Sequence, residues 1–130
     1  STLGASSFIQ MHQTQSKRDR EEQLLFVGDQ YRRAIASYYN TMPPGGSRSL
    51  PKSLEDLVSD QRFPTPIQHL RRIYLDPMTG QADWQLVRDS RGITGVKSNS
   101  SQSTLKKSGF EEKYKKFEGS DFYSDWVFSI

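Results

Sequence analysis

The sequence predicts an α+β fold in which one long α-helix packs on a small antiparallel β-sheet of about three strands. Two observations lead to this prediction. Residues 14–40 contain no proline, and their apolar side chains recur three and four residues apart, as in a helix that buries one stripe. After this segment the chain holds short apolar runs separated by proline and glycine turns, and three of those runs alternate in the manner of β-strands.

The helix predicted over residues 14–40 would span about 40 Å, which is long for a chain of 130 residues. Its apolar stripe consists of Leu24, Val27, Tyr31, Ala34, Ile35 and Tyr38. Its opposite side carries Lys17, Asp19, Glu22, Asp29, Arg32 and Arg33. Gly28 costs a helix about 1 kcal/mol relative to alanine, so its presence indicates close packing there. The helix should end at Asn40, before the proline and glycine run at residues 43–46.

Residues 1–13 are mostly small and polar and allow two interpretations. They form either a frayed lead-in or the middle of a helix whose upstream half is missing. The chain begins at Ser1 without an initiator methionine, which we interpret as a mature or truncated start. No apolar run approaches the length of about 18 residues that crosses a bilayer, and no secretory signal is present.

Two short helices are expected after the long one. The first lies near residues 53–58, where the sequence from Ser53 to Asp56 resembles a capping box. The second lies at residues 108–117, where Ser108 and Glu111 form a capping pair. In that segment the apolar residues recur at helical spacing, at Phe110, Tyr114 and Phe117.

Three strands are expected, at residues 84–87, 93–98 and 125–130, and a hairpin turn at residues 89–92 joins the first two. In the third strand, one face should hold Trp126, Phe128 and Ile130. The sheet therefore falls within residues 84–130, and residues 1–130 form a single domain of two layers.

The composition excludes several classes of site. There is no cysteine, which excludes disulfide frameworks, zinc–thiolate sites and thiol nucleophiles. The chain has 18 Lys and Arg against 15 Asp and Glu, and the two signs are interspersed, so we predict a solvated surface without a phosphate-binding stripe. The 15 aromatic residues (7 Phe, 2 Trp and 6 Tyr) supply enough bulk for a core.

No catalytic constellation is visible, and we do not expect an enzyme. The G-x-S-x-G nucleophile motif is absent, and His12 and His69 lie in polar surroundings that indicate exposure. The glycines at Gly92 and Gly95 belong to the predicted hairpin and match no phosphate-binding loop, so no cofactor is predicted.

Calcium is the one metal that the residues leave open. Two oxygen-rich clusters occur, the first formed by Asp76, Thr79 and Asp83, and the second by Ser120, Asp121, Ser124 and Asp125. Neither has the spacing of a helix–loop–helix site. In the turn at residues 76–80, the aspartate before proline is most simply a hydrogen-bond acceptor.

Binding to nucleic acid is an alternative function. Basic and aromatic residues alternate at residues 71–74 and 113–117, as in proteins that stack bases on aromatic rings. The aromatic residues of the second segment also have the spacing of a core stripe. We therefore rank a small basic nucleic-acid-binding module as the alternative.

Several segments, in this order, resemble the pseudopilins of type II secretion and their type IV pilin relatives, in the branch akin to the major pseudopilin. The segments are KRDREEQLL (17–25), GDQYRRAI (28–35), PKSLEDL (51–57), RFP (62–64), RRIYLDPMTG (71–80), DW (83–84), GITGVKS (92–98) and YSDWVF (123–128). Together they cover most of the chain.

The resemblance implies a non-catalytic structural subunit in the periplasm. A hydrophobic N-terminal helix half, released from a leader by a prepilin peptidase and absent here, would anchor it in the inner membrane and later pack in a filament core. Its partners would be other pilin-like subunits, including minor pseudopilins, and the inner-membrane assembly machinery, not nucleic acid. Charged residues of the long helix would contact neighbouring subunits, namely Lys17, Arg18, Asp19, Arg20, Glu21, Glu22, Arg32 and Arg33.

The sequence departs from this family in two respects. Major pseudopilins typically hold calcium in a C-terminal loop with several acidic residues, whereas the loop at residues 99–106 has none, so the resemblance does not carry a calcium site. The last predicted strand also runs to Ile130 without an acidic tail.

Overall fold

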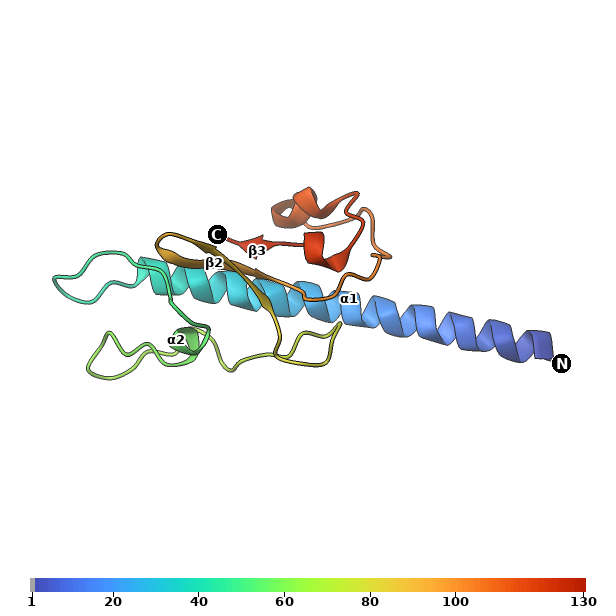
Figure 1. The fold of residues 1–130 in the computed structure, drawn as a ribbon, viewed down its shortest axis with the longest axis horizontal. Helices are drawn as coiled ribbons and strands as arrows, with labels where there is room; N and C mark the ends of the chain where they lie inside the picture. The colour runs from blue at the N-terminus through green and yellow to red at the C-terminus, as the bar shows by residue number, and fades with distance from the viewer. Residues whose placement is uncertain (1) are drawn as a thin grey trace.

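The computed structural model describes the backbone of residues 2–130 and the side chains of residues 14–130. It confirms the α+β fold: the long helix α1 (Thr2–Asn40) packs on a three-stranded antiparallel sheet (Figure 1). The remaining elements are α2 (Glu55–Val58), β1 (Gln85–Asp89), β2 (Gly92–Lys97), the 3₁₀ helices η1 (Glu112–Phe117) and η2 (Tyr123–Asp125), and β3 (Phe128–Ser129).

Helix α1 ends at Asn40 as predicted, before Pro43 and Pro44. It begins at Thr2, so the backbone of residues 2–13 continues the helix and does not form a separate lead-in. The first part of α1 extends beyond all the other elements in Figure 1. The side chain of His12 lies outside the described residues.

The sheet has the strand order β1-β2-β3. The predicted hairpin joins β1 to β2, and a register shift between Val87 and Arg88 interrupts their pairing. Strand β3 is shorter than predicted, because residues 123–125 form the 3₁₀ helix η2 and only two residues pair with β2. Of the three residues expected on one face of this strand, Trp126 and Phe128 are buried and Ile130 is exposed.

The two short helices differ from the predictions in their caps. Helix α2 has no side-chain cap of its own. Of the capping box predicted at residues 53–56, one of the two hydrogen bonds forms, from the backbone N–H of Ser53 to the carboxylate of Asp56. The segment predicted as a helix at residues 108–117 forms only η1, with a kink at Tyr114, although its three aromatic residues are buried as predicted.

The core lies between α1 and the sheet. Every residue of the predicted apolar stripe is buried. Gly28 lies against the ring of Phe128, and a Cβ at this position would be 2.5 Å from the ring atoms. The predicted close packing is therefore confirmed. A cluster of aromatic side chains covers this part of α1, formed by Phe110, Tyr114, Phe117, Tyr123, Trp126 and Phe128.

Candidate interaction surface on the long helix

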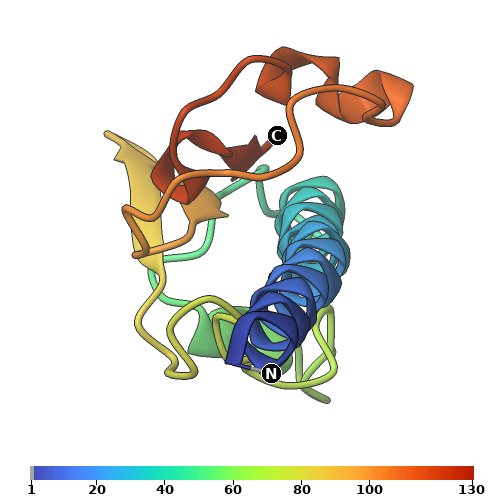
Figure 2. The same cartoon turned by 90° about the vertical axis from the view of Figure 1, so that its right-hand side faces the viewer.

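The outward side of α1 carries a line of exposed residues. Figure 2, seen along the helix, shows α1 at one edge of the molecule, with the sheet beside it. Phe26 projects from this outer side with 60% of its surface exposed, and Asp19 and Glu22 are exposed about two turns and one turn before it, respectively. Arg33 follows two turns after it, and 67% of its side chain is exposed. We call these four residues the outer ridge.

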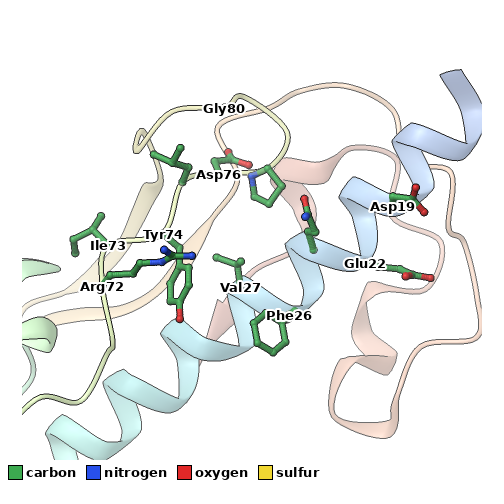
Figure 3. Close-up of a pocket in the computed structure, with 12 residues that line it drawn as sticks. Asp19, Glu22, Phe26, Val27, Arg72, Ile73, Tyr74, Asp76 and Gly80 are labelled. Atoms are coloured by element: carbon green, nitrogen blue, oxygen red, sulfur yellow. The ribbon is translucent and has the colours of Figure 1, made fainter.

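A hollow of about 870 Å³ lies beside the outer ridge, between α1 and residues 72–80 (Figure 3). Its apolar lining comes from Val27, Ile73, Tyr74, Leu75 and Pro77. The acidic side chains of Asp19 and Glu22 also line it. A smaller hollow of about 230 Å³ shares Glu22 and Phe26 with it, and is otherwise lined by Leu25, Asp29, Glu111, Lys113 and Tyr114. An exposed aromatic ring between two hollows is a shape that a second surface can engage.

Asp29, in the smaller hollow, gathers three donors. They are the guanidinium of Arg32 at 3.1 Å, the ammonium of Lys113 at 3.3 Å and the hydroxyl of Tyr114. Burial raises the pKa of Asp29, but these hydrogen bonds lower it by more, so the net pKa lies below its ordinary value. The carboxylate of Asp29 therefore already has its hydrogen-bond and charge partners within the molecule.

Arg32 and Arg33 differ in what they contact. Arg32 is 28% exposed and points inward, donating to Asp29 and, at 3.2 Å, to the hydroxyl of Tyr114. In the part of the chain whose side chains are described, the one charge partner of Arg33 is Asp29, at 4.0 Å. Of the two arginines expected to contact neighbouring subunits, Arg33 is thus the one whose charge is available to another molecule.

Glu21 does not lie on the outer surface, so the expectation that it contacts a neighbouring subunit is wrong. Only 3% of it is exposed, and its Oε2 accepts hydrogen bonds from the backbone N–H groups of Leu105 and Lys106 and from the hydroxyl of Tyr123. Glu21 precedes Leu24 by three residues, which places it beside the buried stripe, where the C-terminal segment covers it. The other expected contacts of the 17–22 run remain at the surface: Arg18, Asp19, Arg20 and Glu22 are exposed, and Lys17 is half-buried, with its ammonium over the Tyr123 ring.

The expectation that His69 is exposed is also wrong. Only 1% of its side chain is exposed. Its Nδ1 lies 2.7 Å from the hydroxyl of Ser37, and its Nε2 lies 2.8 Å from a carboxylate oxygen of Asp60. The segment from Asp60 to Ile67 folds back on itself and brings these side chains to the end of α1. Sequence periodicity could not show this, because Ser37 lies 32 positions before His69.

The hydrogen-bonded chain of Ser37, His69 and Asp60 is best explained by a structural role, not a catalytic one. Arg62 pairs with Asp60 at 2.8 Å and donates to the carbonyl oxygens of Tyr38 and Thr41, which lie at the C-terminal end of α1. Ser37 sits within the helix, where backbone N–H groups are already bonded and cannot stabilise an oxyanion, and neither hollow includes it. These hydrogen bonds therefore attach the C-terminal end of α1 to residues 59–70.

The first candidate calcium cluster is held together by hydrogen bonds of its own. Buried Asp76 accepts from the backbone N–H groups of Met78 and Asn99 and from the hydroxyl of Ser98, at 2.7–3.1 Å. Asp83 accepts from Thr79 and from the amide of Asn99. In the part of the chain that the structure describes, no three acidic or histidine side chains converge as metal ligands would.

The aromatic rings that suggested nucleic-acid binding are mostly covered. Tyr114 and Phe117 are buried in the core, while the ammonium groups of Lys113 and Lys116 lie above their rings. Bases could not stack on these two rings without unfolding the segment. The structure therefore supports the interpretation that the aromatic residues of the 113–117 segment belong to the core.

Comparison with protein-family models, with curated proteins and with solved structures gives no match. Among the described residues, no helix has a stretch that is both long and apolar enough to span a membrane.

Proposed function

We propose that this chain is the periplasmic head domain of a pilin-like structural subunit without catalytic activity. The subunit would polymerise into a type II secretion pseudopilus or a type IV pilus-like filament that supports protein secretion. Its partners would be further copies, minor subunits and the inner-membrane assembly machinery. An apolar helix preceding this sequence would anchor it in the inner membrane.

The observation that carries the proposal is the length of α1 relative to the domain built on it. Helix α1 has 39 residues, and among those whose side chains the structure describes, residues 14–40, the buried ones fall between Glu21 and Tyr38. The first part extends past the sheet and loops, and residues 1–16 contain no charged residue (Figure 1). A helical segment that extends past the rest of a domain is marginally stable in water by itself. Such a segment is expected to be covered by another molecule.

Repeated contacts between different faces of identical subunits produce an open filament. In such a filament the uncharged start of α1 would pack against neighbouring helices, and Asp19, Glu22 and Arg33 would provide lateral charge contacts. The head would keep the helix straight, which explains why several polar ties attach the head to α1, including those of Glu21 and Arg62.

The proposal is tested on the full-length protein in membranes of its source. Mass spectrometry of the native N-terminus should find a processed start followed by about 20 apolar residues. Chemical cross-linking of the membranes should give a ladder of oligomers that Arg33→Glu shortens and Arg33→Lys preserves. A native start without an apolar segment, or the absence of a ladder, would overturn the proposal.

A further inference from the structure

The outer ridge has a symmetry that its composition alone does not reveal. Asp19, Phe26 and Arg33 are seven residues apart, which places them almost in line along α1, at intervals of about 10 Å. Glu22 lies four residues before Phe26 and Gln30 four residues after it, on opposite flanks of that line. An acid and a base are therefore equidistant from one exposed aromatic ring.

We propose that the outer ridge is a self-association surface, on which a second copy of this chain packs antiparallel about a two-fold axis through Phe26. This rotation carries each position before Phe26 onto the corresponding position after it. Asp19 then faces Arg33 of the second copy. The contact is isologous, so this pair occurs twice and the assembly closes as a dimer.

The charges select the antiparallel orientation. A parallel pair in register would place Asp19 against Asp19 and Arg33 against Arg33, and both contacts would be repulsive. Among the described residues, Asp19 accepts one exposed hydrogen bond, from Gln15, and Arg33 is 4.0 Å from its internal partner, so both side chains can make the favourable contacts.

The shape of the surface fits the same partner. Phe26 stands between two hollows, and the larger one is lined by Val27, Ile73 and Leu75, of which Leu75 is strongly exposed. On the two-fold axis the two Phe26 rings pack against each other, and the hollows on either side leave room for both rings. The contact is confined to one helix face and its borders, so the dimer should be weak and should form at high protein concentration.

This inference is independent of the proposed filament. Subunits that grow from one membrane all point the same way, whereas the two helices here point in opposite directions. The two associations would use the same ridge and exclude each other. The dimer is therefore examined with the 130-residue chain in solution, and the filament with the full-length protein in membranes.

The first test is sedimentation equilibrium at protein concentrations up to the millimolar range. The natural sequence should form dimers, and Phe26→Ser should weaken the dimer by about tenfold or more. Arg33→Asp should weaken it about tenfold, and the double variant D19R/R33D should restore it, because each acid again faces a base. Phe122→Ser and Lys115→Asp, which change exposed residues elsewhere, are the matched controls and should dimerise normally. A monomer at every concentration, or a double variant no better than R33D, would overturn the proposal.

The second test fixes the orientation, and the absence of cysteine from the chain makes it unambiguous. Under mild oxidation, a mixture of the D19C and R33C variants should form the mixed disulfide faster than either variant forms its own disulfide. F26C alone should form a disulfide-linked dimer. Faster disulfide formation by D19C with itself and by R33C with itself would show a parallel pair and refute the antiparallel arrangement.

Discussion

The carboxylate of Glu21 accepts a hydrogen bond from the hydroxyl of Tyr123 at 2.8 Å, although 102 positions separate the two residues in sequence. The same carboxylate oxygen accepts the backbone N–H groups of Leu105 and Lys106. Burial raises the pKa of the Tyr123 hydroxyl, and the hydrogen bond to Glu21 raises it further. One carboxylate thus fastens two parts of the C-terminal segment to α1.

Replacing Glu21 with glutamine should lower the free energy of unfolding by about 1–3 kcal/mol. The charge that strengthens three hydrogen bonds is lost, and the amide can present an N–H₂ group to donors. Urea denaturation would measure this change. The matched variant Glu22→Gln, at an exposed position, should stay within about 0.5 kcal/mol of the natural sequence. Equal effects at the two positions would contradict this account of Glu21.

Gly28→Ala should destabilise the fold even though alanine is the better helix former. The new Cβ would lie 2.5 Å from the buried ring of Phe128, which Tyr114 and Phe117 hold from other sides. Overpacking of this kind costs about 1–3 kcal/mol, which exceeds the gain of about 1 kcal/mol in helix propensity. Thermal unfolding would show the loss. A smaller penalty for Gly28→Ala in a Phe128→Leu background would identify the ring as the obstacle.

Trp126 should respond differently to two substitutions. It is fully buried against Phe110, Phe117 and Tyr123, so Trp126→Ala should cost about 3–5 kcal/mol. Its indole N–H has no acceptor among the described residues, so Trp126→Phe removes an unsatisfied donor along with some volume and should cost much less. Chemical denaturation of both variants checks the difference. Similar losses for the two would mean that the N–H does have a partner.

The stability of the fold should fall in acid partly through Asp60. Burial raises the pKa of Asp60, but hydrogen bonds from Arg62 and His69 lower it by more, to about 2, from an ordinary value of 3.8. Because the pKa of the folded state is the lower one, the stabilisation is present above about pH 4 and is lost as the pH falls towards about 2. It amounts to about 2 kcal/mol.

The free energy of unfolding, measured between about pH 5 and pH 2, should therefore fall less steeply for Asp60→Asn than for the natural sequence. If that variant does not fold, an NMR titration of the Asp60 carboxyl group in the natural protein reports the same quantity. A carboxyl group that titrates near its ordinary pKa would show that the pairing with Arg62 is weak in solution.

Structural features that depend on the spacing of residues within a short stretch could be predicted from the sequence. The stripe from Leu24 to Tyr38, the end of α1 at Asn40 and the hairpin at residues 89–92 all come from side-chain periodicity or turn chemistry within a short window. Gly28 also belongs to this group, because a glycine inside a strong helix pattern already indicates a close neighbour.

Tertiary structure alone decided which polar residues are internal. Glu21 and His69 became buried because distant segments supply hydrogen-bond partners, Leu105 for Glu21 and Ser37 for His69, and no short window of sequence contains both members of these two pairs. The exposure of the neighbours Arg32 and Arg33 could not be predicted from the sequence either. Arg32 points inward because it donates to the hydroxyl of Tyr114, 82 positions away, while Arg33 stays in solvent. The sequence by itself determined the long helix and its charged side, and the packing of remote segments determined which of those charges can reach another molecule.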